Sequence, residues 1–468
     1  MTVYDTVISG GTLITPQGRF RGDLGIAQGR IAALSESRLE GRERIDARGL
    51  HVLPGAVDLH VHFNEPGRGH WEGWAYGSRA ALMGGVTTVV EMPLNAIPAT
   101  VNRAALERKL EAARAGSAVD YALWGGLVDN NLADLSSLHH TGTVGFKAFM
   151  VDICDDSFKF APEPILREGM RLAASMGALV AVHAEDSSRA WSRTHALINA
   201  GRTDLGAWLE ARDPQTELNA LHVALKLARD TGCALHVVHN SLPEGVELLA
   251  RAKRAGGAVT LEVCPHHLLL TDEDFLRLGT EAKCAPPLRD RARLEGLWAQ
   301  LAVGQVDCVA SDHSPCPPED KLGGVWRAWG GISGIQTLLP LMLSEGLTRG
   351  LSLEHLVGLL CTRPAQIAGI AHRKGALALG LDADVVLVNL EREWTLQTAW
   401  LQSRHPHSPF VGKKVRGWLE RTVLRGQTLM QGGVVRPDVQ GGGCWLPRAG
   451  VSVDTHSKRL ELKRKEGL

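Results

Sequence analysis

The middle of the chain alternates short apolar segments with longer amphipathic ones, and this alternation constrains the fold more than any other feature. Eight segments have the length and β-branched content of buried strands: GAVDLH (55–60), VTTVVEMP (86–93), VDYALWGGLV (119–128), VGFKAFM (144–150), ALVAVHA (178–184), ALHVVH (234–239), AVTLEVCP (258–265) and VDCVASD (306–312). Helical patterns lie between them, for example RAALERKLEAARAG (103–116), PILREGMRLAASMG (164–177), TELNALHVALKLARDTG (216–232), GVELLARAKRAGG (245–257) and RARLEGLWAQLAVG (291–304). Strands that alternate with helices predict parallel βαβ units, and eight such units predict a (β/α)₈ barrel.

The chain is longer than such a barrel needs. It has 468 residues, whereas a (β/α)₈ barrel takes about 250, so we expect an accessory domain beside the barrel. An open, doubly wound parallel sheet is the alternative α/β architecture. No GxGxxG sequence follows the first strand candidate, and this favours the barrel.

Both ends of the chain have a different, all-β pattern. Residues 1–54 contain short alternating runs broken by turn signals such as GG, PQG and QG, and ADVVLVNL (383–390) and RTVLRGQTLMQGGVV (421–435) resemble them. Because chain termini often lie close together, we expect 1–54 and 374–443 to form one small β-sandwich domain. Residues 55–373 would then form the barrel, and 444–468 a basic C-terminal tail.

The composition is that of a globular protein and argues against several classes of partner. Hydrophobic residues make up 44% and charged residues 22% of the chain. Lys+Arg and Asp+Glu both count 51, so no net charge favours a nucleic acid or an anionic membrane as partner. The first residues lack the basic start and apolar core of a signal peptide, and no apolar run approaches the ~18 residues of a membrane span. With eight cysteines and no CxxC pair, the sequence predicts a cytoplasmic protein with reduced thiols.

Reactive side chains gather at the ends of the predicted strands, where a (β/α)₈ barrel has its active site. His60 and His62 project to the same side, because alternate residues of a strand do so. The candidates at this rim are His60, His62, Lys147, His183, His239 and Asp312. Each of them alone has an ordinary structural explanation, but their convergence on one rim predicts a functional site. His236 is left out, because its place on the strand groups it with none of the others.

Four neutral imidazoles at short range predict a site for divalent metal ions, with zinc as the default. Two ions about 3.5–4 Å apart need a bridging ligand, and the fourth strand holds Lys147 where a carboxylate would serve. Burial lowers the pKa of a lysine, so its neutral amine becomes available. Such an amine can take up CO₂ to form a carbamate. We therefore interpret Lys147 as an N6-carboxylysine that bridges two metal ions.

The segments HVH, FKAFM, VHAE, LHVVH and SDHSPCPP, in this order and spacing, resemble the cyclic amidohydrolases. This family contains dihydroorotases, dihydropyrimidinases (hydantoinases) and allantoinases. The resemblance covers nearly the whole chain, including the late stretch RPAQIAGI…KGALALGLDADVVLVN. It implies a barrel with a binuclear metal centre, a homotetramer, and hydrolysis of a cyclic amide in a small-molecule substrate.

Carried over to this sequence, the resemblance implies a role for each residue of the rim. His60 and His62 bind the more buried metal ion, His183 and His239 bind the more exposed one, and the lysine carbamate bridges both. Asp312 also contacts the buried ion. A metal-bridged hydroxide would attack the ring carbonyl, and Asp312 would take the proton and deliver it to the departing ring nitrogen.

Three details separate the branches of this family. Dihydroorotases resemble HxHFREPG, in which the arginine grips a substrate carboxylate, but this chain has Asn64 in HFNEPGR. Dihydropyrimidinases carry a tyrosine after the bridging lysine that helps to hold the oxyanion, and AFMVDICDDSF has none. By contrast, HFNEPGR, VEMPLN, CAPPLRD, SDHSPCPPE and AWGGISG resemble the allantoinase branch. This implies opening of the hydantoin ring of allantoin to give allantoate, a step of purine degradation.

Two kinds of alternative stay open. Among enzymes, a dihydropyrimidinase (hydantoinase) of broad range is the main rival, and a dihydroorotase is a further one. From another class, dihydropyrimidinase-related proteins keep the barrel as non-catalytic scaffolds after losing the metal ligands. All six ligand positions are present in this chain, which argues against a scaffold.

Substrate contacts are expected from the loops that follow the strands. The candidates are Asn95, Cys284, Pro287, Ser314, Gly330 and Gly331. Structural explanations exist for them too, since Asn95 suits a turn, prolines stiffen loops and glycines allow a close backbone approach.

Overall fold

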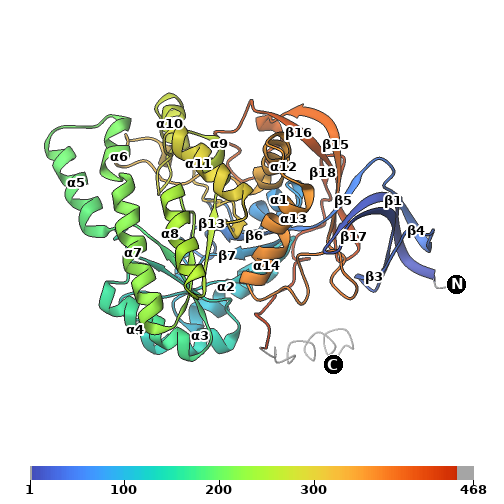
Figure 1. Cartoon of the computed structure of the whole chain (residues 1–468), viewed down its shortest axis with the longest axis horizontal. Coiled ribbons are helices and arrows are strands. Elements are labelled where there is room, and N and C mark those ends of the chain that lie inside the picture. The colour runs from blue at the N-terminus through green and yellow to red at the C-terminus, as the bar shows by residue number, and fades with distance from the viewer. Residues whose placement is uncertain (1–2, 451–468) are drawn as a thin grey trace.

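The computed structural model describes residues 3–450 and divides them into a helix-covered barrel and a terminal sheet (Figure 1). The barrel strands are β6 (Ala56–Val61), β7 (Val86–Glu91), β8 (Asp120–Leu123), β9 (Gly125–Gly126), β10 (Phe146–Phe149), β11 (Leu179–His183), β12 (Ala234–Val237), β13 (Val259–Val263) and β14 (Cys308–Val309). They pair in parallel as β6-β7-β8 and as β9-β10-β11-β12-β13-β14.

Two junctions turn these sheets into a closed ring. Trp124 alone separates β8 from β9, and its N–H donates to the carbonyl of Glu91 on β7 at 3.0 Å, so β8 and β9 act as one interrupted strand. At the other junction the N–H of His62 donates to the carbonyl of His313 at 2.8 Å, which joins the segment after β14 to the end of β6. The predicted (β/α)₈ barrel is therefore confirmed.

Helices cover the outside of the ring, as Figure 1 shows for α7, α8 and α11. The helices are α1 (Trp74–Met83), α2 (Arg103–Gly116), α3 (Leu135–Thr141), α4 (Glu163–Ser175), α5 (Ser187–Asn199), α6 (Leu205–Ala211), α7 (Pro214–Thr231), α8 (Pro243–Arg254), α9 (Pro265–Leu269), α10 (Asp272–Leu278), α11 (Arg291–Ala302), α12 (Leu338–Thr348), α13 (Leu353–Val357) and α14 (Arg363–Ile367). Local chemistry sets their starts. The Asn102 side chain accepts from the N–H of Ala105 at the head of α2, and Asp213 does the same for Thr216 at the head of α7.

Strands from both ends of the chain form the second part. They are β1 (Val3–Thr15), β2 (Gly18–Ala27), β3 (Arg30–Ser35), β4 (Glu40–Asp46), β5 (His51–Pro54), β15 (Val385–Thr395), β16 (Lys414–Leu424), β17 (Gln427–Gln431) and β18 (Val434–Val435). The antiparallel pair β5–β15 joins the two segments, so hydrogen bonds link all nine strands. The predicted association of the two ends is thus present, while the residue boundaries between the domains stay a prediction.

The first four residues of β15 are buried on both faces of the strand because they belong to two cores. Val385 and Leu387 lie in the core of the terminal sheet, whereas Val386 and Val388 lie in the large core shared with the barrel. Alternate residues of a strand point to opposite sides, so the apolar run VVLV supplies both cores at once.

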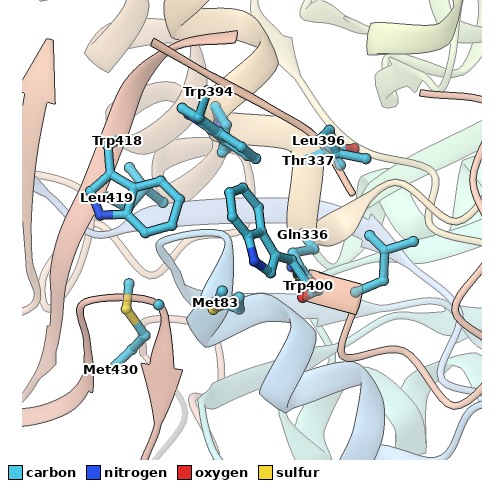
Figure 2. A pocket seen from close by; sticks show the side chains of 12 residues that line it. Met83, Gln336, Thr337, Trp394, Leu396, Trp400, Trp418, Leu419 and Met430 are labelled. Carbon is cyan, nitrogen blue, oxygen red and sulfur yellow. Dashed lines mark hydrogen bonds between the residues drawn. The ribbon is translucent and has the colours of Figure 1, made fainter. Parts of the chain in front are cut away.

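Two further contacts hold the sheet against the barrel. One is a triangle of tryptophans, Trp394, Trp400 and Trp418, whose ring centroids lie 5.0–5.4 Å apart beside Met83 of α1 (Figure 2). These rings line a small, mostly apolar pocket between the sheet and the barrel together with Pro340, Leu396 and Leu419. The other contact is ionic, since the buried ammonium of Lys374 lies 2.5 Å from Asp120 of β8 and 2.7 Å from Asp384 beside β15.

The first residues of the predicted C-terminal tail (444–468) are hydrogen-bonded to the barrel. The carbonyl of Cys444 accepts from the N–H of Tyr121, and the N–H of Leu446 donates back to the carbonyl of Tyr121. Leu446 is buried, so its apolar side chain explains why this stretch packs on the barrel. Residues 451–468 of the predicted tail lie outside the described residues. Within 3–450, no helix has both the length and the apolar character needed to cross a membrane.

Candidate metal centre

His60, His62 and Asp312 meet where the first and last barrel strands close the ring. His60 lies within β6 and His62 follows it, and both are buried. Their Nε2 atoms lie 3.2 Å and 3.4 Å from the same carboxylate oxygen, Oδ1 of Asp312. One ligand-type atom from each residue lies within 4.8 Å of the other two, which is a group that can hold a metal ion.

His183 and His239 form a second pair beside this group. His183 is the last residue of β11 and His239 follows β12. Nδ1 of His183 lies 3.0 Å from Nε2 of His239, and the ring of His239 lies 5.4 Å from that of His60. The four predicted histidines are thus brought together. Nε2 of His60 and of His62 faces Oδ1 of Asp312, and the ring nitrogens of His183 and His239 face each other.

Lys147 lies in β10, fully buried, with no hydrogen-bond partner for its Nζ among the described residues. Burial lowers the pKa of this ammonium to about 7, against the smaller opposing effects of Glu262 and Asp312. Since an isolated buried charge is costly, the neutral amine becomes accessible near pH 7. This orphaned nitrogen is the observation on which the predicted carbamate rests.

The electrostatics of the cluster suit metal ligation. Burial lowers the pKa of His62 to about 4, and it also lowers that of His183 and, further, that of His239. These imidazoles are therefore neutral at pH 7, as a metal ligand must be. Burial alone would raise the pKa of Asp312, but His60 and His62 outweigh it and hold that pKa below its usual range.

Three residues around the cluster have a strained backbone. His239, Asp312 and Asn95 adopt positive φ angles of 37°, 46° and 64°. Such angles are uncommon for residues other than glycine and tend to concentrate at functional sites. Two of these residues, His239 and Asp312, belong to the cluster itself.

Two buried carboxylates that the sequence prediction missed contact the second ring nitrogen of His60 and of His183, the one that does not face the neighbouring cluster residue. Oε1 of Glu262, on β13, lies 2.5 Å from Nδ1 of His60, and its Oε2 lies 3.2 Å from Nε2 of His236. Glu185 lies 2.7 Å from Nε2 of His183. Carboxylates in such positions fix the tautomer of ligating histidines. A lone glutamate inside the apolar run TLEVC was the available signal for Glu262.

A cavity of about 380 Å³ opens above the cluster, and His60, His62, His183, His239 and Asp312 form part of its lining. Among the predicted substrate contacts, Asn95, Ser314 and Gly330 also line it.

The other three predicted contacts, Cys284, Pro287 and Gly331, are not among its lining residues. The carbonyl of Cys284 accepts from Nε1 of Trp208, and that of Gly331 accepts from Nζ of Lys321. The loops hold these two carbonyls in structural bonds.

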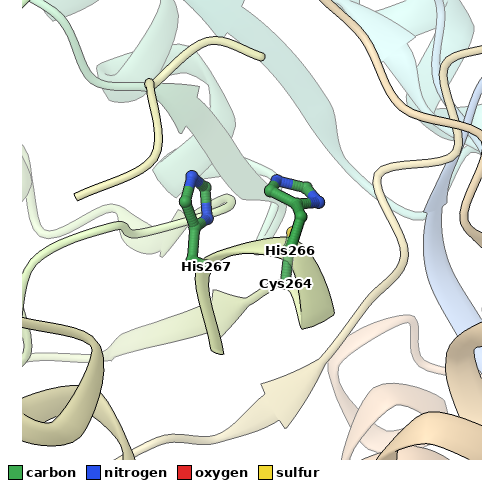
Figure 3. Close-up of side chains that lie close together, drawn as sticks. All are labelled: Cys264, His266 and His267. Carbon is green, nitrogen blue, oxygen red and sulfur yellow. The ribbon is translucent and has the colours of Figure 1, made fainter. Parts of the chain in front are cut away.

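Cys264, His266 and His267 form another group of ligand-type atoms within 4.8 Å of one another (Figure 3). None of them lines the cavity. Burial raises the pKa of the Cys264 thiol well above its usual value, so the sulfur is a neutral thiol and a poor ligand. Nε2 of His267 lies 3.1 Å from the carbonyl of Pro286. This contact gives the group a structural role in holding the 284–287 loop.

The barrel and the cluster at its rim together define a member of the amidohydrolase family. Residues 51–429 match that family, and the chain belongs to it; the family is metal-dependent. An L-hydantoinase (dihydropyrimidinase) from Arthrobacter aurescens has the same fold, with a TM-score of 0.92 and 34% identity over 95% of this chain and 100% of that one.

Curated relatives that match at higher identity are allantoinases. One from Rubrobacter xylanophilus is 48% identical over 439 residues, which is 93% of this chain and 96% of the relative. Another from Deinococcus radiodurans is 44% identical over 432 residues, 92% of this chain and 96% of the relative.

Proposed function

We propose that this chain hydrolyses the cyclic amide of allantoin, opening the hydantoin ring to give allantoate in allantoin degradation. The observation that carries the proposal is the cluster of four histidines and an aspartate in the lining of a cavity, together with the fully buried Lys147, which does not itself line it, in a chain 48% identical to a curated allantoinase. A hydrolase of cyclic amides needs an activated water, a polarised carbonyl and a proton carrier, and this set of residues can supply all three.

Two divalent ions, with zinc as the default, would be held by the six residues. His60, His62 and Asp312 would hold one ion, and His183 and His239 the other, with the carbamate of Lys147 shared between them. The short distances within each histidine group and the orphaned Lys147 nitrogen support this division. When bound, such ions lower the pKa of water and polarise a carbonyl.

The residues of the chain supply the remaining steps. Asp312 is ionised because its pKa is held below the usual range, so it can accept a proton from the attacking water. It can then deliver that proton to the departing ring nitrogen. Glu262 and Glu185 keep His60 and His183 oriented through their other ring nitrogens. Asn95, Ser314 and Gly330 are the best-placed of the predicted substrate contacts, because they line the cavity.

A hydantoinase (dihydropyrimidinase) of broad range is the second candidate, favoured by the fold shared with the Arthrobacter aurescens enzyme. A dihydroorotase is less well supported, since Asn64 replaces the arginine of that branch and is buried away from the cavity lining. A non-catalytic scaffold is disfavoured by the presence of all six residues.

The decisive test measures kcat/KM for allantoin, hydantoin, dihydrouracil and dihydroorotate side by side with metal-loaded protein. We expect the highest value for allantoin. Turnover of dihydrouracil with none of allantoin would instead assign the chain to the hydantoinases. A homotetramer and a cytoplasmic location complete the proposal, and sedimentation analysis of the purified protein tests the first of them.

A further inference from the structure

The cavity has a second polar corner apart from the metal cluster. Trp208 of α6, Arg212 just beyond that helix and Lys283 line it. The Arg212 guanidinium lies 4.4 Å from the centroid of the Trp208 ring, and Nζ of Lys283 lies 4.1 Å from the same centroid. Nε1 of Trp208 donates to the carbonyl of Cys284, which fixes the ring in place. The Trp208 ring therefore contacts the basic groups of both Arg212 and Lys283 at the cavity wall.

The two cations differ in what balances their charge. Arg212 donates to Glu185 at 2.9 Å, and Glu185 in turn contacts His183, so this arginine belongs to the support of the metal cluster. Lys283 forms no ion pair within residues 3–450. Its ammonium donates to one neutral acceptor, the carbonyl of Ala328, at 2.5 Å.

This arrangement leaves Lys283 in need of a further acceptor. Its side chain is buried, with 3% of the residue exposed, yet two of its three N–H groups lack a partner in the described part of the chain. Burial, and then the nearby charge of Arg212, lower its pKa to about 7. A ligand oxygen placed against Nζ would replace the lost water and stabilise the charge.

The proposed substrate has such an oxygen. Allantoin is a hydantoin ring that carries a ureido arm, and the arm ends in a planar group with a strongly accepting carbonyl. If the ring is held at the metal cluster, the arm has to occupy another part of the cavity. The volume of about 380 Å³ is in the range of pockets that enclose a whole small molecule, and Trp191, Trp326 and Trp329 are also part of its lining.

We propose that Lys283, seated on Trp208, binds the ureido carbonyl of the substrate and thereby selects hydantoins with a urea- or amide-type arm. This inference rests on the proposed function and adds a specificity-determining residue to it. Lys283 touches the arm and not the reacting bond. It therefore contributes to the binding of the ground state and the transition state alike, and its loss raises KM more than it lowers kcat.

The test compares metal-loaded wild type with Lys283→Met, whose unbranched side chain is one atom shorter and has no hydrogen-bond donor. Loss of a charge-assisted hydrogen bond is expected to lower kcat/KM for allantoin roughly 10- to 100-fold, mainly through KM. The Ki of unsubstituted hydantoin, measured as a competitor of allantoin, is expected to stay within about twofold. Lys283→Arg keeps a charged donor and should recover part of the loss.

A second measurement needs no variant. With wild-type enzyme, a hydantoin whose arm is a propyl group should compete much more weakly than one with a propionamide-type arm, and Lys283→Met should abolish this preference. An equal loss for allantoin and hydantoin, or an unchanged KM for allantoin, would overturn the role of Lys283. If the wild-type enzyme does not turn over allantoin, the proposed function is wrong. That outcome is distinct from a failure of the role of Lys283 alone.

Discussion

His60 and Asp312 lie on the first strand and just beyond the last strand of the barrel, yet Nε2 of one is 3.2 Å from Oδ1 of the other. The contact exists because the ring closes at this point. The adjacent residues Val61 and His313 form a parallel bridge across the same junction. The junction that closes the barrel therefore also brings these two site residues into contact.

Replacing Asp312 with asparagine separates its two proposed roles. The amide keeps an oxygen that can face the metal, but it cannot carry a proton, so kcat for allantoin should fall by about 10²–10⁴ while metal content stays the same. Elemental analysis and steady-state kinetics on the same preparation measure both. Asp438→Asn, the same change at an exposed ion pair with Arg436 in the terminal segment, should alter neither. Full activity of Asp312→Asn would remove the aspartate from the mechanism.

Glu262 should matter for metal affinity although it touches no substrate. Its carboxylate contacts both His60 and His236, so Glu262→Gln would leave His60 free to adopt the wrong tautomer. Loss of such a partner typically costs about 10–100-fold in metal affinity or activity. Competition with a chelating dye measures the affinity. Equal retention of both ions by the variant and wild type would show that His60 needs no such support.

The fold was predictable because its signals are local. The helix predicted over 103–116 has those bounds, since Asn102 caps it and an apolar stripe marks its inner face. The same stripe does not reveal Lys109, which reads as a polar position but is buried against Glu91, eighteen residues earlier in the chain. Pairing between distant residues leaves no periodic trace in the sequence.

The candidate site was predictable to the extent that it lies at strand ends. Alternation places His60 and His62 together, whereas His239 lies beyond the end of β12 with a positive φ angle that no pattern encodes. Loop residues were harder still. Lys283 is adjacent to the predicted Cys284, and only the folded loop shows that the lysine lines the cavity while the cysteine does not.

Lys374 is expected to be important for the attachment of the terminal sheet. Its ammonium contacts Asp120, Asp382 and Asp384 in a buried cluster, so Lys374→Met would leave carboxylates without their shared partner. Breaking a buried ion pair costs about 3–5 kcal/mol, and partial compensation by Arg425 and Arg373 places the expected loss near 3 kcal/mol. Urea denaturation measures it. Lys414→Met, at an exposed position of β16, should stay within about 0.5 kcal/mol of wild type.

This loss should depend on pH. Burial would raise the pKa of Asp382, but Lys374 and Arg373 outweigh it and hold that pKa below its usual value. A carboxylate with a lowered pKa contributes stability above its unfolded pKa of about 3.9, and this contribution is lost as the pH falls through the folded pKa. The difference between Lys374→Met and wild type should therefore be largest near neutral pH and shrink below about pH 4. A difference that does not change with pH would point to lost packing and not to lost charge.

Reloading of the metal-free protein should depend on pH through Lys147. Carbamate formation needs the neutral amine, and burial lowers the pKa of Lys147 to about 7. The amine is thus mostly neutral at pH 8, and its neutral fraction is about tenfold smaller at pH 6. The pKa of His62 is about 4 and that of His183 is also lowered, so these ligands add little pH dependence in this window.

The experiment incubates metal-free protein with Zn²⁺ at a fixed concentration of dissolved CO₂ and follows the return of activity. The rate constant should be roughly tenfold higher at pH 8 than at pH 6, and it should rise in proportion to CO₂. Lys147→Ala, which removes the amine, should gain nothing from CO₂ at either pH. Reactivation that is equally fast in CO₂-free buffer would mean that another group, or no group, bridges the two ions, because no carbamate can form without its carbon source.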